Sequence, residues 1–207
     1  MMETRWWWLR HAPVAGGSHI LAPADAKADL SDISALSRLA SALPRKARII
    51  TSPLTRARES GAALAGIIGQ QGGAWAPSLI EADFSEQDFG TWEGKSHEAL
   101  GRENPAQSKA FWADPVNHAP PGGESFAAVC TRTARAIERL SQSGKGGDII
   151  IVAHAGAIRA ALSLALGGAP DRALSFALAP LSLTRLTAQS EAEGVASWRI
   201  ETVNQLF

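Results

Sequence analysis

Cysteine is almost absent from this chain of 207 residues, which contains only Cys130. A single cysteine excludes an internal disulfide and any structural zinc site that needs two or more thiolates. A chain without disulfides is typical of a reducing compartment, so we expect a cytoplasmic location. Long hydrophobic runs are absent too, since the first apolar run, Trp6 to Leu9, is too short for a signal peptide and no stretch reaches the length of a membrane span.

Net charge is also absent, because 20 Lys and Arg residues balance 20 Asp and Glu residues. A neutral chain has no bulk attraction to nucleic acid or to an anionic membrane, so we expect neither as a partner. A local basic pocket remains compatible with this balance. A chain of this length buries roughly 70% of its unfolded surface. Because no linker divides it, we expect a single domain over residues 1–207.

Bulky apolar residues open the chain and end in two polar ones. The run from Trp6 to Leu9 does not alternate with polar residues, which is typical of a strand buried on both faces. Arg10 and His11 follow directly, and Pro13 ends any ladder of hydrogen bonds. Ligands of open α/β sheets bind at the carboxyl ends of strands, so we expect Arg10 and His11 at such an edge.

Strands and helices alternate along most of the remaining chain. Short apolar runs predict parallel strands over 47–51, 79–82 and 148–153, and alternating residues predict strands near a sheet edge over 178–187 and 195–203. Helical periodicity predicts helices over 31–43 with Ser31 as N-cap, 53–68 with Pro53 at the first position, 97–113 in short pieces, 124–140 and 155–166. This alternation predicts a three-layer α/β/α fold with a mostly parallel central sheet.

Polar residues follow three of the predicted strands. These are Arg10 with His11, Ser52 with Arg56 one helical turn later, and His154 at a helix start. If the three strands are neighbours, two histidines and two arginines converge beside a helix N-terminus, which favours a phosphate ligand. A histidine there can bind as a cation or attack phosphorus as a neutral nucleophile. Nearby positive charge favours the neutral form.

A proton donor for the leaving oxygen is also needed. Glu86 lies between the second and last core strands and can reach over the crevice, where it would protonate the leaving group and later deprotonate water. Glu81, Asp83, Asp88 and Glu93 are close in sequence, so the residues alone leave the choice of acid open.

Two other interpretations of these motifs are disfavoured. Residues 90–96 resemble a nucleotide-binding P-loop, but the motif is one residue short and follows no apolar strand. Two histidines are also a possible metal-ligand pair, yet Arg10 and Arg56 would repel a divalent cation, and no carboxylate has a helical ligand spacing to His11 or His154. We therefore expect no metal and no cofactor.

Five blocks in the chain resemble those of the histidine phosphatase superfamily, also called the phosphoglycerate mutase-like family. They occur in the family's order, each block alone is a weak signal, and together they are highly specific. Ala12 and Ala155 stand where the family has glycines. The blocks are Leu9-Arg10-His11-Ala12, 52–59, 86–94, 121–125 and 153–156.

The resemblance implies that His11 is the phosphorylated nucleophile, that Glu86 donates and accepts the proton, and that no metal takes part. It implies a phosphoglycerate mutase-like fold with a small helical cap insertion around 95–120. The activity it implies is hydrolysis of a small phosphate monoester through a phosphohistidine. It also implies a phosphate-binding set, which comprises Arg10, His11, Arg56, His154 and Ala155.

The blocks look most like the α-ribazole phosphatase branch, which acts in cobalamin biosynthesis, so α-ribazole 5′-phosphate is one expected substrate. Phosphoglycerate mutase-type transfer is an alternative, although the longer basic insertion of true mutases is missing. A non-catalytic phosphate-binding protein is a second alternative, although none of His11, Arg56 and His154 is lost. Specificity is expected in the loops at 15–30 and 95–120. Both a monomer and a homodimer remain open.

Tryptophan is the commonest aromatic residue and has two expected roles. The three tryptophans from Trp6 to Trp8 are continuous with the first strand, so we expect core packing rather than a stacking platform for bases. Trp92 lies in a segment at 83–96 that we expect to be irregular, and Trp112 lies in the cap. For both residues, substrate contact and simple packing are open.

Overall fold

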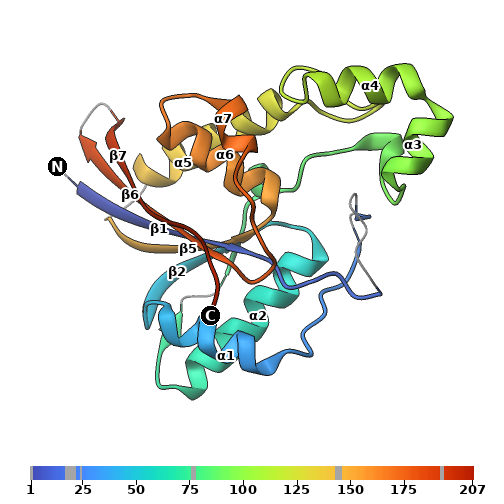
Figure 1. Ribbon diagram of the computed structural model, residues 1–207. Helices are drawn as coiled ribbons and strands as arrows, with labels where there is room; N and C mark the ends of the chain where they lie inside the picture. Colours follow the sequence, from blue (N-terminus) through green and yellow to red (C-terminus); the bar gives the residue numbers. More distant parts are fainter. Residues whose placement is uncertain (1, 17–21, 24, 76–77, 143–145, 192–193) are drawn as a thin grey trace.

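A twisted sheet runs through the centre of the molecule, seen in a computed structural model that describes residues 2–16, 22–23, 25–75, 78–142, 146–191 and 194–207. Within these residues the strand order is β3-β2-β5-β1-β6-β7, with β4 also paired to β2 (Figure 1). The strands are β1 (Met2–Arg10), β2 (Lys46–Thr51), β3 (Ala74–Trp75), β4 (Leu79–Ile80), β5 (Gly147–Ala153), β6 (Leu183–Glu191) and β7 (Gly194–Gln205).

Helices cover both faces of this sheet, which confirms the predicted three-layer α/β/α class. Helices α1 and α2 lie on one face, α5, α6 and α7 lie on the other, and α3 and α4 form the predicted cap to one side (Figure 1). The helices are α1 (Ile33–Ala42), α2 (Thr55–Gln70), α3 (His97–Glu103), α4 (Pro105–Ala113), α5 (Phe126–Gln142), α6 (Ala155–Ala165) and α7 (Pro170–Leu174).

The parallel part of the sheet consists of β1 to β5, and β6 and β7 add antiparallel pairs. Strand β5 lies between β2 and β1 and is parallel to both. Strand β6 pairs antiparallel with β1 and with β7. Both C-terminal strands lie near a sheet edge, as predicted, with β6 between β1 and the edge strand. Only β7 of the two is at the edge.

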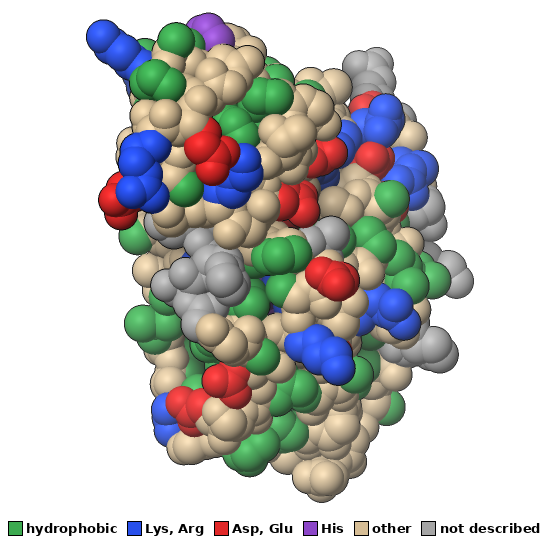
Figure 2. All heavy atoms as spheres, turned by 90° about the vertical axis from the view of Figure 1, so that its right-hand side faces the viewer, with side chains coloured by type: hydrophobic (Ala, Val, Ile, Leu, Met, Phe, Trp, Pro, Cys, Tyr) green, Lys and Arg blue, Asp and Glu red, His purple; other side chains and the backbone are tan. Residues whose placement is uncertain are grey.

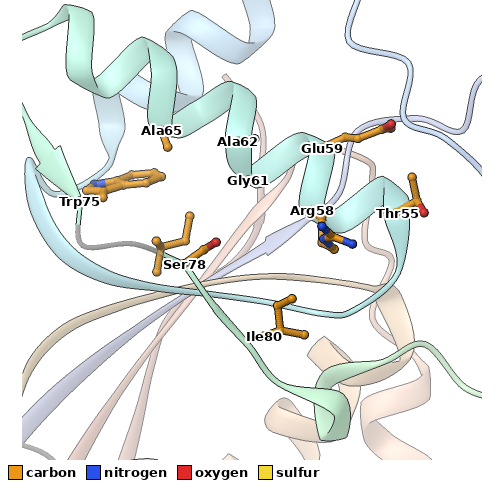
Figure 3. A pocket seen from close by; sticks show the side chains of 10 residues that line it. Thr55, Arg58, Glu59, Gly61, Ala62, Ala65, Trp75, Ser78 and Ile80 are labelled. Carbon is orange, nitrogen blue, oxygen red and sulfur yellow. The ribbon is translucent and has the colours of Figure 1, made fainter.

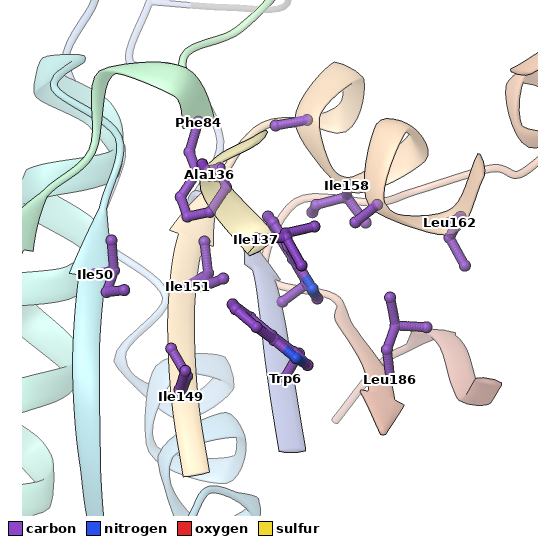
Figure 4. Close-up of a cluster of buried hydrophobic side chains, with 14 of the residues drawn as sticks. Trp6, Ile50, Phe84, Ala136, Ile137, Ile149, Ile151, Ile158, Leu162 and Leu186 are labelled. Carbon is purple, nitrogen blue, oxygen red and sulfur yellow. The ribbon is translucent and has the colours of Figure 1, made fainter. Parts of the chain in front are cut away.

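The apolar run of β1 fills the core on both sides of the sheet, as predicted. Successive side chains of a strand point to opposite faces. Trp6 and Trp8 are fully buried against α5 and α6, where their rings stack 6.4 Å apart (Figure 4). Leu9 is buried on the other face against α1 and α2, and the partly buried Trp7 donates its indole N–H to Asp148 at 2.8 Å.

Several predicted boundaries are wrong for local reasons. The N-cap of α1 is Asp32 rather than Ser31, because the Asp32 carboxylate accepts the amide of Ala35 at 2.8 Å. Helix α2 starts at Thr55, so Pro53 precedes it instead of occupying its first position. Strand β3 and helix α7 were not predicted.

The segment expected to be irregular contains two single turns of 3₁₀ helix, Ala82–Phe84 and Gly90–Trp92. The loop at 15–30 falls partly outside the described residues, at 17–21 and 24. In the part of the chain that the structure describes, every helix is too short or too polar to cross a membrane.

Candidate active site

Three neighbouring strands end at one edge of the sheet and bring the predicted polar residues together. Because β5 separates β1 from β2, His154 follows the strand between those that precede His11 and Ser52. The rings of His11 and His154 lie 5.0 Å apart between centroids. Arg56, in the first turn of α2, places its Nε 3.3 Å from His11 Nε2. The adjacency required by the sequence argument is therefore present.

His11 is buried with one ring nitrogen fixed and the other facing Arg56. Its Nδ1 lies 2.6 Å from the carbonyl oxygen of Ala12, and since a carbonyl only accepts, Nδ1 carries the proton. Nε2 then keeps its lone pair, toward which Arg56 Nε–H donates. Burial, with the charges of Arg56 and Arg10, lowers the pKa of His11 to about 3. His11 is thus neutral at pH 7, with Nε2 available as a nucleophile.

His154 is fully buried and held by Ser52. The Ser52 hydroxyl lies 2.7 Å from His154 Nε2 and also accepts the amide of Leu54 at 3.2 Å. If the hydroxyl donates to Nε2, the His154 proton lies on Nδ1, which has no hydrogen-bond partner among the described residues. Burial, followed by the charges of His11 and the arginines, holds the pKa of His154 well below its usual range.

Arg10 and Arg56 supply positive charge from two different elements. Arg10 donates through Nη1 to the carbonyl of Leu178 at 2.5 Å, while its buried Nε lacks a partner within the described chain. Arg56 donates through Nη1 to the carbonyl of Pro23 at 2.9 Å. Burial lowers the pKa of both guanidinium groups, and Glu86 opposes that shift. Arginine remains charged at pH 7, so the crevice favours an anion.

The two alanines that replace family glycines occupy tight backbone positions. Ala12 is fully buried, and its amide donates to Ser60 Oγ at 2.9 Å, which ties the end of β1 to α2. Ala155 is the first residue of α6, where amides have no intrahelical acceptor and can bind an anion. The chain therefore accommodates both methyl groups beside the crevice.

The Glu86 carboxylate lies against the start of α6. Its Oε1 accepts the amides of Gly156 at 2.9 Å and Gln87 at 3.0 Å. A Cβ at position 156 would lie 2.3 Å from this oxygen, so any residue other than glycine would displace the Glu86 carboxylate. The sequence analysis assigned no role to Gly156. A glycine at the second position of a helix is unfavourable for the helix itself, and this could have indicated a close contact there.

The other candidate acids have different partners. Glu81 pairs with Arg139 at 2.7 Å and Asp83 with Arg135 at 2.8 Å, both along α5. Asp88 accepts the amide of Gly90 at 2.7 Å. Burial lowers the pKa of the Arg56 guanidinium, and Glu93 is close enough to oppose that shift. Geometry therefore favours Glu86, which lines the same cavity as Arg10.

Comparison with known proteins places the chain in a family. Residues 30–201 match the model of the histidine phosphatase superfamily (branch 1). The chain belongs to this superfamily. The matched range begins after Arg10 and His11, so the assignment of those two residues rests on the geometry of the crevice.

Curated relatives and solved structures agree with this family. A bifunctional protein of Mycobacterium tuberculosis, Rv2228c, is 31% identical over 161 residues, a match covering 77% of this chain and 41% of that protein. The chain thus spans about two fifths of that relative's length. A glucosyl-3-phosphoglycerate phosphatase of Mycolicibacterium vanbaalenii is 31% identical over 153 residues, covering 69% of this chain and 64% of the relative.

The fold also matches that of the branch favoured by the sequence motifs. The structure of the α-ribazole phosphatase from Shigella flexneri has a TM-score of 0.79 and 22% identity, and the match covers 98% of this chain and 96% of that one. At this identity the likeness concerns the fold. The histidine phosphatase fold predicted from the motifs is confirmed.

One helix residue holds the segment that carries Glu86 in place. Arg132 of α5 donates to the carbonyls of Asp83 at 2.6 Å, Ser85 at 3.0 Å and Glu86 at 3.1 Å. It also contacts both carboxylate oxygens of Glu124, at 2.7 and 3.1 Å. Sequence reasoning did not identify Arg132, because a helical arginine is usually exposed.

A cavity of about 280 Å³ opens beside the crevice and beneath the cap. Arg10, Glu86, Ala155 and Arg159 line its inner side, and aromatic residues of the cap line its outer side. Trp112 lines it and is 46% exposed, whereas Trp92 is buried with Leu100 and Phe111. Of the two tryptophans considered, Trp112 therefore lines the cavity and Trp92 packs the cap.

Surface charge and a second cavity do not point to another centre. On the face shown in Figure 2, acidic and basic side chains are interspersed among the described residues. A larger cavity of about 640 Å³ lies between α2 and the short strands β3 and β4 (Figure 3). Its lining includes Arg58, Glu59 and Trp75, but no described histidine lines it.

Proposed function

We propose that this protein is a metal-independent phosphomonoesterase that uses His11 as a nucleophile, in a single domain over residues 1–207. The observation that carries the proposal is the His11 Nε2 lone pair, 3.3 Å from Arg56 Nε in a buried, cationic crevice. We propose a cytoplasmic enzyme whose partner is a small phosphate ester rather than nucleic acid or membrane.

Binding of the phosphoryl group uses donors that lack partners within the described chain. Arg10 Nε and His154 Nδ1 are both buried and unpartnered, and an unmade hydrogen bond on a buried donor costs about 1–3 kcal/mol. A phosphate dianion would satisfy both, together with Arg56 and the Ala155 amide. In this proposal the same donors bind the equatorial oxygens on which charge accumulates in the transition state.

The reaction then takes two in-line steps. First, His11 Nε2 forms a bond to phosphorus while the ester P–O bond breaks, and the leaving oxygen takes the proton of Glu86 in its acid form. The Ala12 carbonyl, already bonded to Nδ1–H, stabilises the positive ring. In the second step water attacks phosphorus, Glu86 takes a proton from that water, and the P–N bond breaks. Inorganic phosphate and neutral His11 are regenerated.

The substrate class follows from the relatives and the cap. The relatives include phosphatases named for glucosyl-3-phosphoglycerate and α-ribazole phosphate, and we propose a small phosphorylated metabolite of this kind. Hydrolysis is favoured over mutase chemistry, because two cap cations are paired with acids. Lys95 contacts Glu103 at 2.5 Å and Arg102 contacts Glu98 at 3.2 Å.

The test is phosphate release from a panel of phosphomonoesters in the presence of chelator, including α-ribazole 5′-phosphate and 3-phosphoglycerate, with His11→Ala as comparison. We expect turnover by the wild type, loss in the variant, and an acid-labile phosphoryl group on His11 after rapid quenching. Turnover that persists in folded His11→Ala, or that chelator removes, would overturn the mechanism.

A further inference from the structure

One cation beside the active site has no part in the mechanism described above. Arg159, on α6 one turn beyond the Glu86 contact, lines the cavity beneath the cap together with Arg10. Its Nε donates to the carbonyl of Phe176 at 3.0 Å. Among the described residues, its two terminal nitrogens have no hydrogen-bond partner; burial lowers the pKa of its guanidinium, and the nearby Glu86 carboxylate opposes that shift.

The side chain is positioned rather than free to swing. Arg159 Nε donates a hydrogen bond to the carbonyl of Phe176, and Arg10 Nη1 donates one to the carbonyl of Leu178. Both carbonyls lie in the segment between α7 and β6. The two guanidinium groups are close enough that Arg159 lowers the pKa of Arg10. In the proposed mechanism Arg10 binds the phosphoryl group. The terminal nitrogens of Arg159 then remain as hydrogen-bond donors for another group of a ligand in the adjoining cavity.

Apolar residues also line this cavity. Phe111 and Trp112 of α4 meet edge to face with centroids 4.9 Å apart, and Phe89 and Pro115 continue the wall. The cavity volume of about 280 Å³ is near the lower end of ligand pockets, about 300 Å³, which suits one ring or a short chain. A group bound in this cavity therefore has both aromatic side chains and a guanidinium within reach.

We propose that Arg159 binds a carboxylate on the leaving group while the aromatic cap wall packs against that group's apolar face. The preferred substrates are then phosphomonoesters whose leaving group carries a carboxylate next to a ring or hydrocarbon. A guanidinium matches a carboxylate bidentately, which a neutral leaving group cannot exploit. This inference rests on the proposed phosphatase function and narrows its substrate class.

The test compares two aryl phosphates of nearly equal shape, 4-carboxyphenyl and 4-carbamoylphenyl phosphate, together with their 3-substituted isomers. Each is assayed with the wild type, Arg159→Met and Arg172→Met. Arg172 lies on the neighbouring α7 but is exposed and does not line the cavity, so it controls for loss of a nearby charge. The ratio of kcat/KM values between carboxylate and amide esters cancels much of any general damage.

We expect Arg159→Met to lower kcat/KM for a carboxylate ester roughly 10- to 100-fold, the size of a charged hydrogen bond, and for its amide partner less than about threefold. Arg172→Met should leave both unchanged. An equal loss on both esters would reduce Arg159 to a structural support for Phe176 and overturn the inference. If the wild type hydrolyses none of the esters, or if His11→Ala hydrolyses them equally well, the proposed function fails instead.

Discussion

The phosphate crevice and the cap cavity adjoin each other but are built in different ways. In the crevice, His11, Arg56 and His154 are 4%, 3% and 0% exposed, and each is held by hydrogen bonds at the end of a core strand or the start of a helix. In the cap, Trp112 is 46% exposed and lies on a helix of nine residues. The sheet thus fixes the positions of the proposed catalytic side chains, while the proposed substrate contacts come from two short helices at its side.

Their packing explains how separable the two regions are. The cap has its own small cluster of Trp92, Leu100 and Phe111, partly covered by Phe89. The crevice residues instead follow strands whose side chains fill the two large cores on either side of the sheet. Helices as short as α3 and α4 have little stability on their own and depend on this cluster. Because the cluster is separate from the two large cores, substitutions in it should not disturb the sheet. Substitutions in the crevice should therefore cost far more activity than substitutions in the cap.

The largest effect is expected for Arg56→Met. Removing this buried guanidinium takes away both a phosphate donor and the charge beside His11 Nε2, so kcat/KM should fall at least roughly 10³-fold. Arg58→Met is the matched control, since Arg58 lies in the same helix but is exposed. Steady-state kinetics with circular dichroism measure both. Comparable losses in the two variants would mean that the crevice is not the catalytic centre.

A smaller loss is expected for Gly156→Ala. The new Cβ would lie 2.3 Å from Glu86 Oε1, and because that oxygen ends a flexible side chain, the carboxylate should move while the fold persists. Alkyl phosphates should lose roughly 10²-fold in kcat, the size of general acid catalysis, and nitrophenyl phosphate far less, because its phenolate leaves without a proton.

Gly66→Ala provides the control for this glycine substitution. Gly66 is also helical, but nothing lies within 4 Å of its added Cβ, so activity should be unchanged. If Gly156→Ala slows both classes of ester equally, one of the neighbouring acids rather than Glu86 would carry the proton.

Most of the crevice was predictable from the sequence because its residues follow strands. Apolar runs identified β1, β2 and β5, and side chains that follow neighbouring parallel strands meet at one edge, so Arg10, His11 and His154 could be grouped without coordinates. The order of the motifs identified the family. These signals are local in sequence, and the regular sheet brings the residues that carry them close together in space.

What could not be predicted depends on contacts between distant segments. Arg132, Gly156 and Arg159 act through carbonyls or carboxylates far away in sequence, and nothing in their own neighbourhoods distinguishes them from ordinary helix residues. The choice of Asp32 over Ser31 as N-cap was a one-residue ambiguity between two good capping residues. The cap cavity escaped prediction because its wall combines segments that no periodicity connects.

Burial of neutral histidines also predicts a dependence of stability on pH. His11 has a pKa of about 3 in the folded chain and an ordinary value near 6.5 when unfolded, so below about pH 6.5 the unfolded state binds more protons. Stability is therefore full above that pH and falls as the pH drops. From about pH 7.5 to about 5.5, His11 should account for a loss of about 1.4 kcal/mol in the free energy of unfolding.

Urea denaturation of the wild type and His11→Asn at the two pH values measures this term. The variant should lose about 1.4 kcal/mol less than the wild type across the interval, while His154 continues to contribute in both. Identical pH dependence would show that His11 is not buried as a neutral side chain, and would weaken the contrast between the enclosed crevice and the open cap.

The smallest effect belongs to the cap. Trp112→Ala removes one half-exposed ring from the cavity wall, and the loss of a single aromatic contact of about 0.5–1 kcal/mol should raise KM for phenyl phosphate roughly twofold to fivefold. The kcat should stay near the wild-type value, because no group that moves a proton or contacts phosphorus changes. Methyl phosphate, too small to reach the wall, should show no change in either constant. A large fall in kcat on both esters would mean that the cap orders the crevice, and the separation between fixed chemistry and variable recognition would not hold.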